Sequence, residues 1–292
     1  MKFLSFNLKG FERLGWLQDD NKTVLAIDRE NRGMPQTLMD VIKRGPYAQH
    51  QIKQAKDAME SYDLDELELI APIVPWATFS IEANSTDQTE VDKLKSATYP
   101  TINLRTPRNH VPHRVVMDIP LKTKTLECEG KLVVVIGRSG RYISLEHASR
   151  YIFGFSIYNE GTVKEFQNHT SQFGMGRMFD MSAGFGPAIV TVDEVGDIYQ
   201  QTIETRIDGQ IVESLALSKM RQTIEEIIVY ITSGVTVFPG DIICIGIPSG
   251  DKAKAERFMQ PNEEVEISIS NVGTLFNRIN DEPSTPRTVG CC

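Results

Sequence analysis

Three ionisable side chains alternate in the segment LECEGKLVVVIG, which covers residues 126–137. They are Glu127, Glu129 and Lys131, and five apolar residues follow them. In a β-strand, side chains two residues apart lie on the same face. The pattern therefore predicts two carboxylates and an ammonium on one face of one strand. Such a face is either a salt-bridged surface or a site where a lysine lies among carboxylates that suit a metal ion.

The histidines and cysteines show no pattern of a metal site or a nucleophile. His110 and His113 lie in NHVPHR, where Pro112 argues against a helical pair of ligands, so we expect both in a solvated loop. None of the four cysteines has the CxxC or Cys/His spacing of a zinc site. Cys128 lies between two glutamates, which raise the pKa of a thiol, so it is not expected to act as a nucleophile.

Length and charge narrow the class of protein. The chain has 292 residues, of which 40% are hydrophobic, and this length suggests one or two domains. A net charge of -8 and the lack of a basic run disfavour a nucleic-acid partner. No apolar stretch approaches the roughly 20 residues of a membrane span, and polar residues interrupt the apolar N-terminus. We therefore expect a cytoplasmic protein without a membrane partner.

The first part of the chain, residues 1–68, is predicted to form a small α+β domain. Short strands are expected within residues 1–30, where apolar and polar residues alternate around an Asp-Asp-Asn turn. Within residues 35–61, apolar residues at helical spacing predict two helices, and Gly45-Pro46 separates them.

Residues 69–285 are predicted to form a second domain rich in strands. Its pattern includes a buried strand over 131–137 and a helix that Ser144 caps and Gly154 ends. Apolar residues at helical spacing predict another helix from Ser218 to Gly234. With no GxGxxG motif or P-loop, the order favours an α+β fold dominated by a sheet. Residues 286–292 are expected to be a disordered tail, although Cys291-Cys292 would suit prenylation in a eukaryote.

Four stretches of the second domain resemble the fumarylacetoacetate hydrolase family in order and spacing. They are EGKLVVVIGRSGRYISLEHASRYIFGFSIYNEGT, GRMFDMSAGFGPAIVTVDEVGD, FPGDIICIGIPSG and EEVEISISNVGTLFNRI. The resemblance covers about residues 71–280 and depends on all four segments being in register. It implies a mixed β-roll with flanking helices and, as is usual in the family, a homodimer. Family members use a divalent metal, usually magnesium, to chelate a 2-oxo acid or β-dicarbonyl substrate and stabilise its enolate.

At the metal site, this sequence departs from the family pattern. The family's Glu-x-Glu reads Glu129-Gly130-Lys131 here, so an ammonium replaces the second carboxylate. The third ligand, an aspartate that follows an asparagine, reads Asn159-Glu160. Mg²⁺ and Mn²⁺ require oxygen ligands, and an ammonium repels them. The resemblance therefore implies that only Glu129 and Glu160 keep ligand positions, and we expect no tightly bound metal.

Other active-site positions of the family also differ in this chain. The catalytic histidine aligns with Gln88, which cannot act as a general base. Two family lysines become Arg105 and Arg177, and two threonines of the pocket floor become Ile245 and Ile247. On this resemblance we expect both arginines, Gln88 and Ile247 to contact the substrate.

We hypothesise that Lys131 takes the place of the metal. Its ammonium would bind both Glu129 and Glu160, or one of them and an oxygen of the substrate. Arg105 and Arg177 would complete an anion-binding pocket, because a guanidinium can clasp a carboxylate through two hydrogen bonds. Lys131, Glu129 and Glu160 are thus the predicted catalytic residues.

The leading interpretation is an enzyme that acts on a 2-oxo acid or a β-dicarbonyl compound without the usual metal. Tautomerisation, decarboxylation and C–C bond cleavage all need the enol or enolate stabilisation that such a site offers. One alternative is a non-catalytic binding or partner protein, which a pocket filled by Met181, Ile245 and Ile247 would favour. Another is an orthodox magnesium-dependent acylpyruvate-type hydrolase, completed by His110 or His113.

Overall fold

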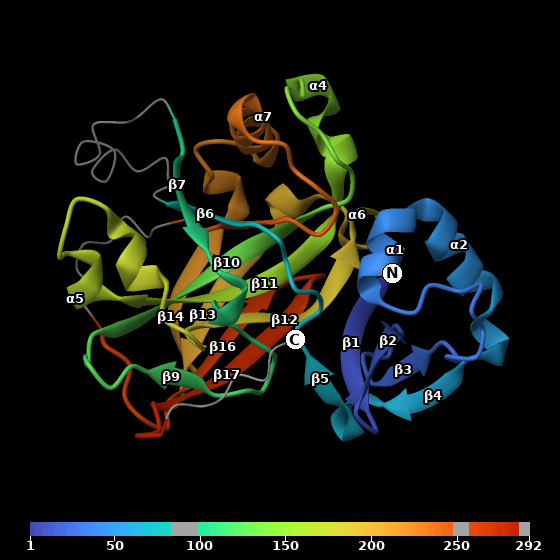
Figure 1. The fold of residues 1–292 in the computed structure, drawn as a ribbon, viewed down its shortest axis with the longest axis horizontal. Coiled ribbons are helices and arrows are strands. Elements are labelled where there is room, and N and C mark those ends of the chain that lie inside the picture. The colour runs from blue at the N-terminus through green and yellow to red at the C-terminus, as the bar shows by residue number, and fades with distance from the viewer. Residues whose placement is uncertain (83–98, 248–256, 286–292) are drawn as a thin grey trace.

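The computed structural model describes residues 1–82, 99–247 and 257–285. Within these residues, a 12-stranded sheet and a 5-stranded sheet share one hydrophobic core, and short helices lie around them (Figure 1). This arrangement confirms the predicted α+β fold with a dominant mixed sheet. Gln88 and the predicted tail lie outside the described residues, so the predictions for them stay predictions.

The larger sheet contains the strands that position the site. Its strands are β1 Lys2–Leu8, β2 Phe11–Leu17, β3 Thr23–Ala26, β4 Glu60–Asp63, β5 Glu68–Ile70, β6 Thr78–Glu82, β7 Thr101–Arg105, β8 His110–Val111, β10 Leu126–Ile136, β11 Ile152–Val163, β12 Ala183–Thr191 and β15 Ile242–Ile245. They follow the order β4-β3-β2-β1-β12-β11-β10-β15-β6-β7, with β5 beside β1 and β8 beside β12. The long strands β10 and β11 lie near the middle, where neighbours shield both of their edges.

The smaller sheet covers one face of these central strands. Its strands are β9 Met117–Ile119, β13 Thr202–Ile207, β14 Gln210–Ala216, β16 Glu264–Ile269 and β17 Gly273–Asp281, in the order β14-β13-β16-β17-β9. Val265, Ile267 and Ile269 alternate along β16 and are all buried. They join Leu132 and Val134 of β10 in the main core, as period-2 alternation predicts for a strand with one covered face.

The N-terminal part forms a distinct lobe but belongs to the same sheet. It contains β1 to β5 with helices α1 (Leu38–Arg44) and α2 (Pro46–Gln54), on the right of Figure 1. Gly45 separates the two helices, as predicted, with a positive φ of 59°. β1 pairs with β12 in antiparallel register, Phe3 opposite Ile189, and both side chains are fully buried. The lobe is therefore joined to the rest by backbone hydrogen bonds as well as by packing.

Two helix boundaries differ from the prediction. Helix α7 spans Ile224–Gly234 and does not begin at Ser218, because Thr223 and Glu226 form a capping box that sets its first turn. Helix α4 covers only Leu145–Ala148, and strand β11 already begins at Ile152. Gly154 consequently lies within a strand and does not end a helix. A Cβ atom there would lie 2.2 Å from the Val190 carbonyl oxygen, so this glycine permits close approach of β12.

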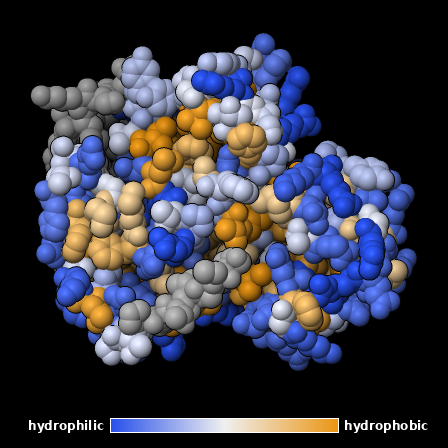
Figure 2. Space-filling model, viewed as in Figure 1, coloured by the Kyte–Doolittle hydropathy of each residue, from blue (hydrophilic) through white to orange (hydrophobic). Residues whose placement is uncertain are grey.

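The remaining α-helices of the described residues are short and lie at strand ends: α5 spans Lys164–Gln167 and α6 spans Val192–Val195. No helix among the described residues is both long and apolar enough to cross a lipid bilayer. The two lobes meet along a furrow where some hydrophobic side chains reach the surface (Figure 2). A groove of about 590 Å³ lies between Leu17 and Leu69 of the N-terminal lobe and the β16–β17 turn.

Gly161 of β11 offers a direct test of the packing around the central strands. A Cβ atom at this position would lie 2.0 Å from the Ser182 carbonyl oxygen, a contact that only a backbone shift can relieve. We expect Gly161→Ala to lower the free energy of unfolding by about 1–3 kcal/mol, as overpacking does. Gly234→Ala is the matched control because nothing lies within 4 Å of its Cβ position. Equal urea midpoints for the two variants would contradict this account.

Candidate functional site

Strands β10 and β11 bring together the three residues that the sequence singles out. In their antiparallel register Glu129 lies opposite Glu160, and Lys131 lies opposite Tyr158. Directly opposed residues share a face of the sheet, as do residues two apart on one strand. Glu129, Glu160 and Lys131 therefore project to the same side because of backbone pairing alone.

Strand β6 adds two residues that the sequence analysis missed, Ser80 and Glu82. β6 is separated from β10 by β15, which is paired with both strands up to Ile245. Beyond Ile245 comes Gly246, and a Cβ atom there would lie 2.2 Å from Glu129 Oε1 and 2.8 Å from Lys131 Cε. The absence of a side chain at Gly246 thus lets Lys131 reach across the end of β15 to β6.

The Lys131 ammonium is the centre of the cluster and its side chain is fully buried. It forms an ion pair with Glu160 Oε2 and lies 3.2 Å from Glu82 Oε1 and 3.9 Å from Glu129 Oε2. It also donates to Ser80 Oγ at 3.0 Å and to the Ile81 carbonyl oxygen at 3.2 Å. Lys131 therefore points among the carboxylates and away from bulk water, as the hypothesis requires.

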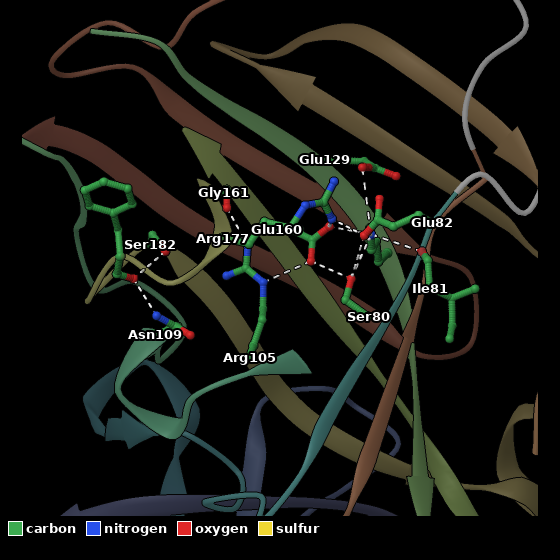
Figure 3. Close-up of polar contacts among 12 residues, drawn as sticks. Ser80, Ile81, Glu82, Arg105, Asn109, Glu129, Glu160, Gly161, Arg177 and Ser182 are labelled. Atoms are coloured by element: carbon green, nitrogen blue, oxygen red, sulfur yellow. Dashed lines mark hydrogen bonds and ion pairs between the residues drawn. The ribbon is translucent and has the colours of Figure 1, made fainter. Parts of the chain in front are cut away.

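Two arginines hold Glu160 from other directions, and Figure 3 shows how they converge on it. Arg105, at the end of β7, places Nε 3.0 Å from Glu160 Oε1 and donates from Nη2 to the Gly161 carbonyl oxygen. Arg177, in the 3-10 helix Phe173–Arg177, donates from Nη1 to Glu160 Oε2 and to Glu82 Oε1. The Ser80 hydroxyl donates to Glu160 Oε1 at 2.6 Å. We call Ser80, Glu82, Arg105, Glu129, Lys131, Glu160 and Arg177 the charge cluster.

The three cations and three carboxylates of the charge cluster stabilise one another's ionised forms. Burial alone would raise the pKa of Glu160, but Lys131, Arg177 and Arg105 outweigh it and lower that pKa well below the ordinary value. Burial would lower the pKa of Lys131, but Glu129, Glu160 and Glu82 outweigh it and raise that pKa. At neutral pH, Lys131 is consequently an ammonium and Glu160 a carboxylate.

Glu129 differs from the other carboxylates of the charge cluster. Burial raises its pKa to about 7, the nearby charges of Glu82 and Glu160 add to the rise, and Lys131 opposes it. Its side chain is one-third exposed, whereas those of Glu160 and Lys131 are fully buried. Glu129 is thus a group of the cluster that solvent or a ligand reaches and that can exchange a proton near neutral pH.

Other predicted site residues lie elsewhere or differ from expectation. Ile247 is buried in the main hydrophobic core, with 2% of its surface exposed, and its role toward a substrate stays a prediction. His110 is not in a solvated loop, because its ring nitrogens are buried beside Tyr158 and Phe185. Burial lowers its pKa to about 3. His113 was also expected in solvent, but burial lowers its pKa to about 4 and its Nδ1 accepts from a backbone N–H.

A simple signal in the sequence could have found Ser80 and Glu82. They lie two residues apart in TFSIE, which alternates as a strand does, and they share one face of β6. What the sequence could not show is that β6 lies beside β15, because that pairing joins residues more than 160 positions apart. The charged end of β6 was therefore visible in the sequence, but its distance from Lys131 was not.

The charge cluster contains the oxygen atoms that a divalent ion would need, but Lys131 lies among them. Glu82, Glu129 and Glu160 each offer a carboxylate oxygen, and these atoms lie within 4.8 Å of one another. Such oxygens suit Mg²⁺ or Mn²⁺. The Lys131 ammonium, however, lies within 4.0 Å of an oxygen of each of the three, and Arg177 contacts two of them. With the side chains so arranged, the site does not fit a divalent cation.

The fold and the charge cluster define a mixed β-roll protein that carries its site at the ends of adjoining strands. A family model described as fumarylacetoacetate (FAA) hydrolase C-terminal matches residues 77–280. The chain belongs to the fumarylacetoacetate hydrolase family. It is 29% identical to oxaloacetate tautomerase YisK of Bacillus subtilis, over 96% of this chain and 100% of that protein.

Two solved structures show the same architecture. A fumarylacetoacetate hydrolase from Exiguobacterium antarcticum superposes with a TM-score of 0.82 at 26% identity, covering 96% of this chain and 99% of that chain. Maleylpyruvate hydrolase from Sphingobium sp. SYK-6, solved in complex with manganese(II) and pyruvate, gives a TM-score of 0.81 at 17% identity, with 96% and 99% coverage. The family model confirms the predicted family, and these two likenesses confirm its fold.

Proposed function

We propose that the protein is an enzyme that interconverts the keto and enol forms of a 2-oxo dicarboxylic acid of the oxaloacetate class. The observation that carries this proposal is the buried Lys131 ammonium, which lies beside the partly exposed Glu129. The resemblance between this chain and a protein named oxaloacetate tautomerase supports the choice of reaction. Tautomerisation needs only a proton acceptor and a cation that stabilises the enolate, and the charge cluster offers both.

The proposed reaction moves one proton. Glu129, as a carboxylate, accepts a proton from the carbon next to the oxo group, and the oxo oxygen becomes an enolate. The Lys131 ammonium stabilises this oxygen by a charge-assisted hydrogen bond, and Arg177 binds the neighbouring carboxylate. Glu129 then returns the proton to the enolate oxygen, which completes the enol. Arg177 keeps a buried Nε–H group without a hydrogen-bond partner among the described residues, and this group can donate a hydrogen bond to a substrate oxygen.

Hydrolysis has less support than tautomerisation. It requires one group that deprotonates water and another that protonates the leaving carbon, and His110 and His113, which could add a second group to Glu129, lie outside the charge cluster. Proton transfer between carbon and oxygen of one substrate needs no activated water. Decarboxylation also passes through an enolate and would use the same residues, so it is a side reaction that the assay must follow.

The rival proposal is a non-catalytic binding protein with the same fold. One observation favours it: the three cations of the charge cluster are already paired with three carboxylates. Glu129 argues against it, because its side chain is more exposed than the other charged groups of the cluster and its raised pKa lets it exchange a proton near neutral pH. The two proposals differ in whether proton exchange is accelerated.

The test is ketonisation of enol-oxaloacetate, followed by its ultraviolet absorbance, with pyruvate formation measured in parallel. We expect the purified protein to accelerate ketonisation well above the buffer rate, and dialysis against EDTA to leave the rate unchanged. Acceleration that disappears with EDTA and returns with Mg²⁺ or Mn²⁺ would overturn the metal-free mechanism. If the protein accelerated the ketonisation of neither enol-oxaloacetate nor an enol acylpyruvate, the result would favour the proposal of a non-catalytic binding protein.

The rate should depend on pH through Glu129. Because Glu129 must be ionised to accept a proton, the turnover number is expected to rise with pH, to be half-maximal near pH 7, and to level off above it. Glu129→Gln should lower the rate by about 100-fold or more and remove the rise. A wild-type rate that is constant from pH 5.5 to 8.5, after subtraction of the buffer rate, would exclude this role.

Gly246→Ala should disturb the site without unfolding the protein. The new methyl group would lie within 2.2 Å of Glu129 Oε1 and 2.8 Å of Lys131 Cε, so both side chains must move. Displacement of a catalytic group by about 1 Å can cost roughly 100-fold in rate, and we expect a loss of that order in kcat/KM. Gly33→Ala is the control, because its Cβ position lies in ordinary contact distance, 3.6 Å, of Asn31. Equal kcat/KM values for the two variants would count against the placement of Gly246.

A further inference from the structure

One oxygen atom of Glu82 is contacted by three other side chains of the charge cluster. Arg177 Nη1 donates to Glu82 Oε1, and Lys131 Nζ lies 3.2 Å from the same atom. The Ser80 hydroxyl is also 3.2 Å away, although its proton is shared with Glu160 at 2.6 Å. Two cations and a hydroxyl around one carboxylate oxygen form a complete anion-binding site. In this structure the anion is supplied by the chain itself.

The Lys131 ammonium has no hydrogen-bond donor left for a substrate. An ammonium carries three N–H groups. Nζ contacts four oxygens within 3.2 Å, those of Glu160, Ser80, Ile81 and Glu82. A substrate oxygen can bind Lys131 only after one of these acceptors leaves. Arg177 Nη1 likewise has no free N–H group, because it already donates to Glu82 and Glu160.

Among these acceptors, Glu82 is the one that can withdraw. Glu160 is fully buried in the middle of β11 and is bound by Lys131, Arg105, Arg177 and Ser80. The Ile81 carbonyl belongs to the backbone. Glu82 is the last residue of β6, and its side chain retains 16% exposure. Rotation of this one side chain would free donors on Lys131 and Arg177 and leave the rest of the charge cluster intact.

Charge balance supports the same conclusion. Lys131, Arg105 and Arg177 carry three positive charges, and Glu82, Glu129 and Glu160 carry three negative ones when all are ionised. A 2-oxo acid is an anion, so its entry into a neutral, buried site adds an unpaired charge. Withdrawal of Glu82 leaves one positive charge without a partner, which the substrate's carboxylate can match.

We propose that Glu82 occupies the position of the substrate's carboxylate and that a 2-oxo acid must displace it in order to bind. The proposal rests on the proposed function for the identity of the anion. Glu82 is then a specificity-determining residue. A monocarboxylate without an oxo group next to its carboxylate binds weakly and cannot displace Glu82. A 2-oxo acid can, because its carboxylate and the adjacent oxo oxygen bind Arg177 and Lys131 together and replace both of the contacts that Glu82 gives up.

The test is the affinity for oxalate, an unreactive anion with the two adjacent oxygen-bearing carbons of a 2-oxo acid, measured by calorimetry at constant ionic strength. We expect Glu82→Gln to bind oxalate at least tenfold more tightly than the wild type, and Glu82→Asp to lie between them. Glu127→Gln is the matched control. It removes one negative charge from the nearby strand β10, where Glu127 pairs with Lys164 outside the charge cluster, and it should change the affinity by less than threefold.

Several outcomes would overturn the proposal. Equal oxalate affinity in wild type and Glu82→Gln would show that Glu82 does not compete with an anion, and so would an equal gain in Glu127→Gln. Absence of oxalate binding in all folded variants, judged by their circular dichroism melting curves, would do the same. The enol-oxaloacetate assay is independent of these results. Tight oxalate binding by Glu82→Gln without wild-type turnover would refute the tautomerase and leave the displacement of Glu82 standing.

Discussion

Lys131→Met is expected to lower the turnover number of the proposed tautomerase reaction by about 100- to 1,000-fold, the loss typical of a removed donor to a developing oxyanion. Methionine has a similar length and no charge, so the variant keeps the volume of the side chain and loses only the ammonium. Because the enolate oxygen bears its negative charge mainly in the transition state, the loss should appear in kcat more than in KM.

The position of Lys131 explains why its expected effect exceeds that of most other residues. Its ammonium is fully buried and lies within 4.0 Å of all three carboxylates of the charge cluster. In a site shielded from water, one preorganised cation interacts more strongly with a developing charge than it would at the surface. No other cation of the described residues lies as close to Glu129, the proposed proton acceptor.

Lys164→Met is the control for this experiment. Lys164 pairs with Glu127 at 3.1 Å and is one-third exposed, so its loss removes the same charge outside the site. Its variant should keep the wild-type rate within about twofold, since exposed ion pairs contribute little. If Lys131→Met retained more than a third of the wild-type turnover number, the mechanism built on this ammonium would be wrong.

Glu160→Gln should produce the largest loss of stability. Glu160 binds three cations and has no exposed surface, so an uncharged amide would leave Lys131, Arg105 and Arg177 buried with too little negative charge. Breaking a buried ion-pair network by removal of one partner typically costs about 3–5 kcal/mol. We expect a loss of that order in the free energy of unfolding, measured by urea denaturation at pH 7. Glu127→Gln should cost less than about 1 kcal/mol, because its ion pair is partly exposed.

The stability supplied by Glu160 should disappear in acid. Lys131, Arg177 and Arg105 lower its folded-state pKa against the opposing effect of burial, while in the unfolded chain the value is near 4.5. As the pH falls below about 4.5, the unfolded chain therefore binds a proton before the folded protein does, and stability is lost. The difference between the urea midpoints of wild type and Glu160→Gln should begin to shrink below about pH 4.5 and be smaller at pH 3 than at pH 6. A difference that stayed constant over this range would show that Glu160 is not held as a carboxylate by its neighbours.

The sequence predicted the parts of the site that depend on local pattern. The alternation around Lys131 predicted β10 and the shared face of Glu129 and Lys131. The family resemblance placed Glu160 on the next strand, and the structure sets it opposite Glu129. The resemblance also predicted Arg105 and Arg177 as site residues, and both contact Glu160 in the structure. Their catalytic and binding roles remain to be tested by the variants above.

The parts that were missed depend on contacts between distant segments. Glu82 enters the charge cluster only because β6 pairs with β15, and no local pattern encodes that pairing. His110 was expected in a solvated loop because Pro112 argues against a helical pair of ligands, but Tyr158 and Phe185, which enclose it, lie on other strands. The predicted helix over 144–154 was too long because residues from Ile152 onward pair with β10 and β12, and sheet pairing outweighs local helix propensity.

The pairing of β1 with β12 has a practical consequence for work with fragments of this protein. A truncated chain that starts at residue 69, where the predicted second domain begins, would lose β1, the strand that pairs with Ile189 and Val190 of β12, and keep only β8 on that edge, at Ala183 and Gly184. Ile189, which Phe3 covers, would then face water beside a bare strand edge. Such edges recruit other chains, so the excised second domain should precipitate or form strand-exchanged assemblies, and functional assays need the first strand in place.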